Sequence, residues 1–232
     1  MIRKFFATEG AKLKEMNFTD KRQYIWEYYK LHIFALGCLI VVTGSIVNNV
    51  FINPPMRDYL YIAWQAGMVP QEALQDMSER LSVIAEDQER YWVTVRSYEL
   101  TGDPQMDQAI ITRFHAILTV GDLHAMITTG EWIEQNAVFG IIRPVDDLLA
   151  AVEELCPALY EKITDRISTI TFTPRDEEVA ITDRMAISLL DAPLFTEAGF
   201  VTEDLYLCII INSDRVYETA KALWVMFYEG AE

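Results

Sequence analysis

The chain has 232 residues, of which 51% are hydrophobic and 12% aromatic, a composition that excludes intrinsic disorder and suits one ordinary domain with an appendage. The charge is unevenly distributed: seven basic and four acidic residues give residues 1–30 a net charge of +3, while twelve basic and thirty-one acidic residues give residues 53–232 a net charge of −19. Because so acidic a segment would repel a phosphate backbone, we expect no nucleic acid among the partners.

Residues 31–52 form an uncharged run, LHIFALGCLIVVTGSIVNNVFI. Its 22 residues reach the roughly 20 needed to cross the hydrocarbon core of a bilayer. Within residues 33–47 only Thr43 and Ser45 are polar, so the run lacks the polar face of a soluble core helix. We predict a single transmembrane helix at residues 31–52, in contact with the lipid bilayer.

Two alternatives concern processing of this run. A cleaved signal peptide has a short basic start and an A-x-A-like site, whereas thirty residues precede this run and no such site follows it. A lipoprotein signal would rest on Ala-Leu-Gly-Cys at residues 35–38. Cys38, however, lies early in the run, and a lipid-attachment cysteine should end it. We therefore expect the anchor to be retained.

The flanks of the run predict its orientation. Lys21, Arg22 and Lys30 precede it, which by the positive-inside rule places the basic segment 1–30 in the cytoplasm and residues 53–232 outside. Aromatic residues at the same end, as in an interfacial belt, are Tyr24, Trp26, Tyr28 and Tyr29. Residues 19–30 are expected to continue the helix at the membrane surface.

The prolines at 54 and 55 indicate a stiff linker, residues 53–57, before a domain at residues 58–232. Apolar runs predict strands at residues 58–64, 91–100, 123–128, 168–172, 186–190 and 202–212, with a brief extended piece at residues 141–144. Helical spacing predicts helices at residues 70–87, 106–118, 130–139, 145–154 and 215–228. The early strand–helix alternation favours an α/β fold, a three-layer domain with a mostly parallel sheet.

Two segments carry a resemblance: TVGDLHAMITTGEWIEQNAVFGIIRPVDDLL (residues 119–149) and DLYLCIIINSDRVYETAKALWVMF (residues 204–227). Their turn at residues 140–148, and the Asn-Ser turn at residues 212–213 with the aromatic helix after it, resemble extracellular solute-binding proteins of bacterial importers. The resemblance implies one lobe of such a protein, with strand order 2-1-3. Together with the predicted transmembrane helix, which replaces the cleaved signal usual in that family, it implies a single-pass protein of the bacterial cell membrane, with this domain in the cell envelope.

Ligands of open α/β sheets bind beyond the carboxyl ends of the strands, which defines the candidate binding residues. They are Trp64 and Gln65 after the first strand, Ser97 and Tyr98 at the end of the second, and Thr128, Thr129, Glu131 and Trp132 after the third. Trp132 would stack on a sugar, and the Thr128 and Thr129 hydroxyls would hold a polar or anionic group. Alternatively, a threonine caps the helix, Glu131 complements its dipole and Trp132 packs on the sheet.

Catalytic and metal-binding patterns are missing from the sequence. The three histidines have no carboxylate or cysteine at ligand spacing, and no GxSxG, HExxH or P-loop motif occurs, so we expect neither a cofactor nor an enzyme. Pairing of Cys156 with Cys208 stays open, although Cys208 lies in an apolar run and suits packing as a small hydrophobe.

The sequence therefore predicts a membrane-anchored extracytoplasmic binding module that engages a small solute or an envelope protein. The alternative is a non-catalytic structural or regulatory subunit of a membrane protein complex, in which the helix and the basic cytoplasmic segment are the working parts.

Overall fold

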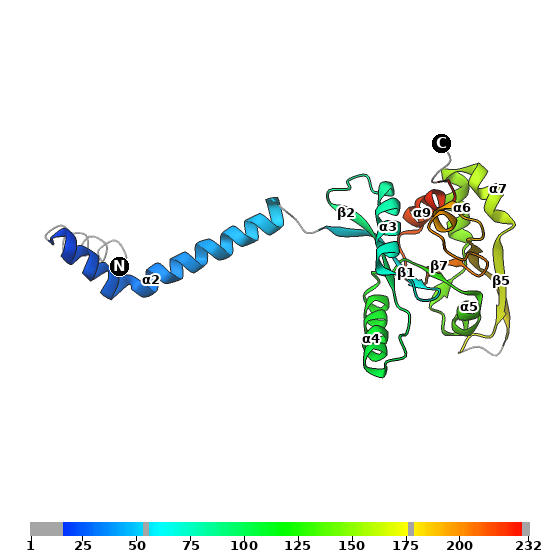
Figure 1. The fold of residues 1–232 in the computed structure, drawn as a ribbon, viewed down its shortest axis with the longest axis horizontal. Helices are drawn as coiled ribbons and strands as arrows, with labels where there is room; N and C mark the ends of the chain where they lie inside the picture. Colours follow the sequence, from blue (N-terminus) through cyan, green and yellow to red (C-terminus); the bar gives the residue numbers. More distant parts are fainter. Residues whose placement is uncertain (1–15, 53–55, 176–178, 229–232) are drawn as a thin grey trace. The chain divides into compact units, whose positions relative to one another are not determined.

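The computed structural model describes residues 16–52, 56–175 and 179–228. The chain divides into two compact units, Met1–Pro55 and Met56–Glu232. The described residues of the first form one long helix, and the second is an α/β domain whose elements are labelled in Figure 1.

The long helix of the first unit is α2 (Phe18–Val47), which continues into one π-helical turn, η1 (Asn48–Ile52). Its segment Trp26–Ile52 is long and apolar enough to span a membrane, and none of that apolar window is buried. The ring centroids of Tyr24 and Tyr28 lie 4.7 Å apart, so these two tyrosines, one helical turn apart, lie on the same side of the helix.

The α/β domain is built on one seven-stranded sheet with the order β2-β1-β3-β7-β6-β5, in which β4 also pairs with β7. Its strands are β1 (Arg57–Gln65), β2 (Tyr91–Ser97), β3 (Ala125–Thr128), β4 (Ile142–Arg143), β5 (Ile167–Phe172), β6 (Ile181–Ser188) and β7 (Tyr206–Ile210). Its longer helices are α3 (Gln71–Leu81), α4 (Pro104–Val120), α6 (Asp146–Leu155), α7 (Pro157–Thr164) and α9 (Val216–Tyr228). The shorter ones are η2 (Ser82–Ile84), α5 (Gly130–Asn136), η3 (Ala137–Phe139) and α8 (Pro193–Glu197).

The sheet is mixed, which corrects the predicted mostly parallel arrangement. Strands β2, β1 and β3 are parallel, because the helices α3 and α4 supply the long crossovers that parallel pairing needs. The remaining pairs, β3–β7, β7–β6, β6–β5 and β4–β7, are antiparallel. Residues 157–200, whose pattern is indistinct in the sequence, fold into α7, the β5–β6 hairpin and α8.

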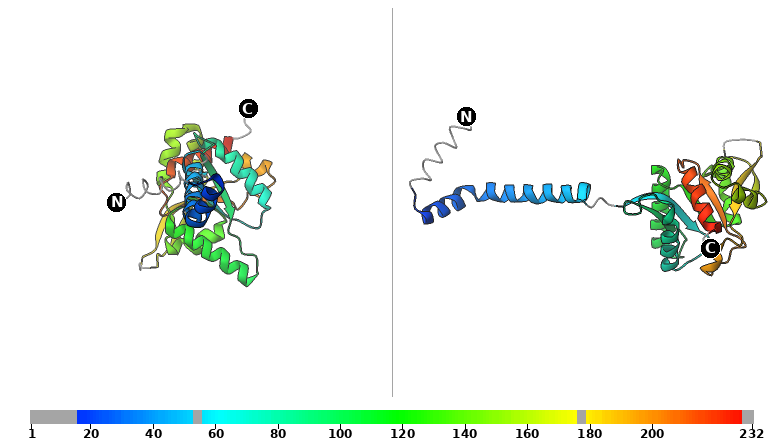
Figure 2. Two further views of the ribbon diagram at one scale, coloured as in Figure 1. Left: turned by 90° about the vertical axis from the view of Figure 1, so that its left-hand side faces the viewer. Right: turned by 90° about the horizontal axis from the view of Figure 1, so that it is seen from above.

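Two core clusters lie on opposite faces of this sheet. On β1, Leu60, Ile62 and Trp64 belong to one cluster while Tyr61 and Ala63 belong to the other, as strand alternation requires. The first cluster includes residues of α3, α6, α7, α8 and α9, and α4 and α5 lie on the second. Figures 1 and 2 show these helices around the sheet.

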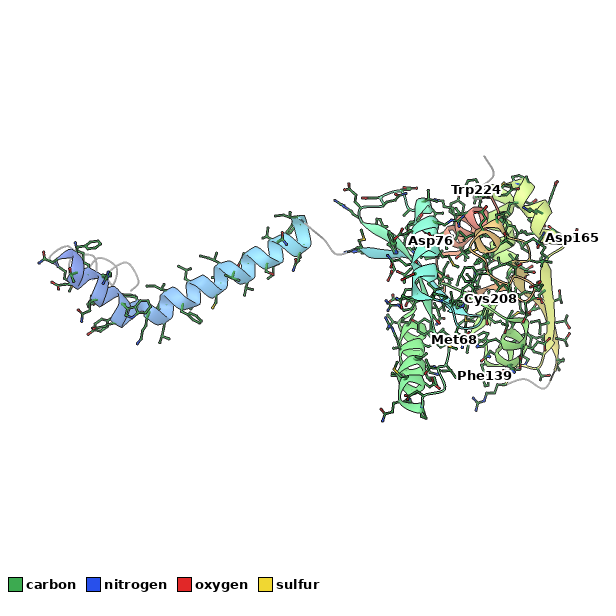
Figure 3. All side chains as sticks on the ribbon, in the orientation of Figure 1. Met68, Asp76, Phe139, Asp165, Cys208 and Trp224 are labelled. Atoms are coloured by element: carbon green, nitrogen blue, oxygen red, sulfur yellow. The ribbon has the colours of Figure 1, made fainter. Side chains whose placement is uncertain are left out.

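The cysteines of the domain do not form a disulfide. Cys208 lies fully buried on β7 in the second cluster (Figure 3), whereas Cys156 follows α6 and packs against the first, so the sheet separates the two. Burial raises the pKa of the Cys208 thiol, as expected for a small core hydrophobe.

The outer edge of β2 is capped by two serine hydroxyl groups. Buried Ser78 of α3 accepts a hydrogen bond from the Val95 amide, and buried Ser82 accepts one from the Val93 amide, both at 2.9 Å. Each hydroxyl also donates to a helical carbonyl oxygen, Leu74 O and Ser78 O respectively. The two serines therefore satisfy strand amides that would otherwise present a pairing edge to another chain.

Candidate functional site

The predicted binding residues do lie at one end of the parallel strands. Pairing places Trp64 of β1 beside Ser97 of β2 and Gln65 of β1 beside Thr128 of β3. Tyr98 follows β2 directly, and α5 begins just after β3. The carboxyl-edge rule thus brings the expected set of residues together, but it does not decide which side chains reach solvent.

Two of the aromatic candidates are core residues and cannot offer a stacking surface. Trp64 is 1% exposed and packs against Phe195 and Phe200, while its indole N–H donates to Gly67 O at 2.9 Å. Tyr98 is 2% exposed, and its hydroxyl lies 2.8 Å from that of Tyr61. Burial raises the pKa of Tyr98, so this hydroxyl stays neutral. Trp64 points into the first core cluster and Tyr98 into the second.

The start of α5 is already occupied. The Thr129 hydroxyl accepts from Trp132 N at 3.3 Å, and the Asp204 carboxylate accepts from Gly130 N at 3.1 Å, where an anionic ligand would bind. Buried Thr128 donates to Gln65 O. Of the remaining candidates, Glu131 is exposed and accepts a hydrogen bond from Gln135. Trp132 is half-buried against the second cluster. The Oε1 atom of Gln65 is buried and forms no hydrogen bond within the described residues.

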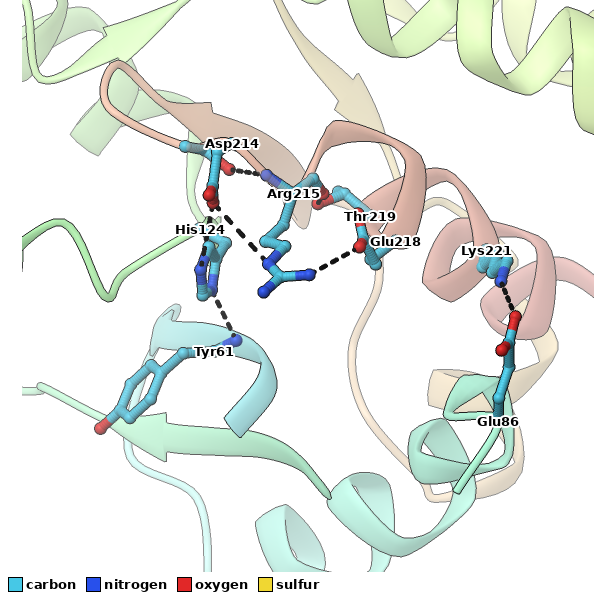
Figure 4. A network of polar contacts seen from close by, with 9 residues as sticks. Tyr61, Glu86, His124, Asp214, Arg215, Glu218, Thr219 and Lys221 are labelled. Atoms are coloured by element: carbon cyan, nitrogen blue, oxygen red, sulfur yellow. Dashed lines mark hydrogen bonds and ion pairs between the residues drawn. The ribbon is translucent and has the colours of Figure 1, made fainter. Parts of the chain in front are cut away.

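A polar network stands at the opposite end of the same strands (Figure 4). His124, directly before β3, is buried; its Nδ1 accepts from Tyr61 N at 3.0 Å and its Nε2 lies 3.8 Å from an Asp214 carboxylate oxygen. Arg215 donates to Glu218 at 2.9 Å, which raises the pKa of Arg215. Burial lowers the pKa of His124 below its ordinary 6.5, although Asp214 acts in the other direction. His124 is therefore a neutral hydrogen-bond acceptor.

We expect the domain to lose stability as the pH falls, through His124. In the unfolded chain His124 binds a proton near pH 6.5, whereas in the folded chain it does so only at a lower pH, because its folded pKa is lowered. The contribution of His124 to stability is therefore complete above about pH 6.5, and it is lost as the pH falls through the lowered pKa of the folded state. His124→Asn keeps an acceptor for Tyr61 N but does not titrate. Urea unfolding from about pH 8 to about pH 5 should show a weaker pH dependence in this variant. Equal slopes would contradict the assignment.

An apolar groove of about 450 Å³ lies on the face covered by α9. Its lining residues are Val83, Ile84, Leu155, Cys156, Lys221, Trp224 and Val225. Trp224 stands on its wall with 44% exposure and stacks on Tyr228, with 6.1 Å between ring centroids. Figure 3 shows this tryptophan on the outer side of α9. An indole beside an apolar groove has the character of a protein-binding hot spot.

Sequence reasoning missed this groove. The helical pattern places Trp224 on the buried face of α9 with Val216, Ala220, Leu223 and Phe227, but the structure buries both neighbours of Trp224, Leu223 and Val225, and exposes Trp224 itself. A helix made mostly of apolar residues has no clear polar face. Its sequence periodicity therefore does not indicate that Trp224 is exposed.

Within the residues that the structure describes, no group of three histidine, cysteine, aspartate or glutamate side chains is arranged to hold a metal ion. Comparison with known protein families, with curated proteins and with solved structures finds no match to this chain.

Proposed function

We propose that this chain is a membrane-anchored, non-catalytic binding module whose domain captures a segment of a protein partner in the groove beside Trp224. The observation that carries the proposal is the half-exposed indole on the wall of an apolar groove, while the aromatic side chains predicted to bind a solute, Trp64 and Tyr98, are buried. The non-enzymatic assignment predicted from the sequence is part of this proposal.

Membrane anchoring rests on the segment Trp26–Ile52, which meets the length and apolarity of a spanning helix. The excess of basic residues before it supports a cytoplasmic N-terminus and an extracytoplasmic domain. Anchoring favours a partner in the same membrane or close to it, because tethering raises the effective concentration of the groove there.

The chemistry of the partner follows from the charge around the groove. Exposed acidic residues adjoin its lining residues in sequence: Glu86 and Asp87 after Ile84, and Glu153 and Glu154 before Leu155. One lining cation, Lys221, lies 4.0 Å from Glu86. We expect the captured segment to bring an apolar anchor flanked by basic side chains, with association that slows as salt screens the attraction.

Site-specific photocrosslinking in the native membrane tests this function. A benzoylphenylalanine placed at Val83, on the groove, should yield a discrete crosslinked product, and Trp224→Ala should reduce that product more than about tenfold, as for a hot-spot residue. The same crosslinker at Ile111, an exposed apolar position on α4, is the control. A product of equal yield from both positions, or one insensitive to Trp224→Ala, would contradict the proposal.

Trp224→Ala is suited to this test because it should leave the fold intact. The side chain is 44% exposed, and its stacking on Tyr228 contributes about 0.5–1.5 kcal/mol. A circular-dichroism melt of the variant separates loss of binding from loss of structure.

A further inference from the structure

A second, smaller pocket lies at the carboxyl end of β2, away from the Trp224 groove. Its volume is about 270 Å³, and it is lined by Val69, Gln71, Leu74, Val95, Arg96, Ser97 and Arg113. β2 is an edge strand of the sheet, so the pocket is bounded by α3 and α4, and none of the described strands pairs with β2 on that side. Its volume lies just below the range of about 300–1,000 Å³ typical of ligand pockets, which suits a ligand of few heavy atoms.

Two arginines without a carboxylate partner give this pocket its charge. Within the described parts of the chain, neither Arg96 nor Arg113 forms a hydrogen bond or an ion pair. By contrast, five other arginines of the domain pair with carboxylates: Arg80, Arg90, Arg143, Arg184 and Arg215. In a segment of net charge −19, two uncompensated guanidinium groups in one pocket mark a site for an anion.

The nearby acidic side chains do not neutralise these arginines. The Glu99 carboxylate accepts from Gly67 N at 2.7 Å and is thereby held at the loop after β1. Glu72, in the first turn of α3, forms no ion pair with either arginine. The Asp58 carboxylate accepts from the Thr94 hydroxyl on β2 and, within the described residues, forms no ion pair with either arginine, although both Asp58 and Arg96 act on the pKa of Tyr61 and Tyr98. The pocket therefore keeps a positive charge, which Asp58 reduces.

Further donors lie beside the arginines. The Ser97 hydroxyl oxygen accepts from Glu99 N at 3.3 Å, which leaves the hydroxyl hydrogen to donate. Because the Val93 and Val95 amides face the outer edge of β2, strand alternation directs the Ser97 amide to the same edge. The eleven-residue helix α3 begins at Gln71 with no side-chain cap, so the positive end of its dipole also adjoins the pocket.

We propose that this pocket binds a small organic carboxylate, with the carboxylate between Arg96 and Arg113 and a short hydrocarbon part against Leu74, Val69 and Val95. Guanidinium groups match the paired oxygens of a carboxylate through two parallel hydrogen bonds. The lining is mostly polar, and Val69, Leu74 and Val95 supply a smaller apolar wall that a short hydrocarbon part would contact.

The test is calorimetric titration of the full chain in neutral detergent micelles with butyrate, succinate and inorganic phosphate. The uncharged isostere butyramide is the ligand control. Arg96→Gln and Arg113→Gln remove the charges of the pocket, and Arg90→Gln, at an exposed arginine outside it, is the matched control. Thermal melts confirm that each variant is folded; Arg113 is exposed, so its variant should fold normally.

We expect saturable binding of butyrate or succinate that weakens at least about tenfold in either pocket variant, the effect of losing a hydrogen bond to a charged group. Arg90→Gln should leave binding within about twofold, and butyramide should not bind. No saturable carboxylate binding, binding of phosphate alone, or equal weakening by Arg90→Gln would overturn the proposal. The Trp224→Ala variant should bind the carboxylate normally, so the outcome is independent of the groove.

Discussion

Replacing Trp64 by alanine should lower the free energy of unfolding of the domain by about 3–5 kcal/mol, because it removes a fully buried indole and leaves a cavity. The lost contacts include the rings of Phe195 and Phe200, and the variant also leaves Gly67 O without its indole donor. Since domains have total stabilities of about 5–15 kcal/mol, such a loss is a large share. Urea unfolding of residues 56–232 measures it, because both core clusters lie wholly within that segment.

Two variants make this result diagnostic. Trp64→Phe retains an aromatic ring and should recover much of the loss, while lacking the hydrogen bond to Gly67 O. Trp132→Ala should cost less than Trp64→Ala, since Trp132 is only half-buried. A ligand-stacking residue would instead affect binding and spare stability, so a Trp64→Ala domain of near wild-type stability would contradict the core position.

Most helices and strands of the domain could be predicted from the sequence, because their apolar spacing is regular and short turns separate them. The predicted strand at residues 123–128 corresponds to β3, and the predicted helix at residues 106–118 corresponds to α4. Residues 157–200 were harder: α7 is only eight residues long, and β6 exposes several residues before its buried end. Strand direction was harder still, because the partner of β3 is β7, about eighty residues away in sequence.

The candidate site shows a different limit. The sequence identifies residues that follow strands, and the structure does place Gln65 and Thr128 side by side at one edge. It cannot show that Phe200, from a distant loop, covers Trp64, or that Asp204 fills the start of α5. The exposed position of Trp224 and the convergence of Arg96 and Arg113 are equally tertiary. They depend on how α9 packs beside η2 and α6, and on how α3 and α4 pack beside β2, which no local pattern in the sequence records.

The serine caps on β2 were also beyond sequence reasoning, since a serine within a helix is ordinarily unremarkable. Their energetic weight should nevertheless be large. Ser78→Ala leaves the Val95 amide, and Ser82→Ala the Val93 amide, without an acceptor beneath α3, at about 1–3 kcal/mol for each unsatisfied buried donor. The double variant Ser78→Ala/Ser82→Ala should therefore have a much lower free energy of unfolding than the wild type, as measured by urea unfolding of residues 56–232.

A control variant separates two effects on stability: loss of the acceptor for a strand amide, and loss of the hydrogen bond from the hydroxyl to the helix backbone. Thr112 of α4 donates to Gln108 O, as Ser78 donates to Leu74 O, but Thr112 is exposed and accepts from no strand amide. Thr112→Ala should therefore change stability by about 0.5 kcal/mol or less. If Ser78→Ala were equally mild, the capping role would be wrong. If the prediction holds, the double variant should also self-associate more readily than the wild type, because the uncapped amides of β2 then offer an edge to which a second chain can pair.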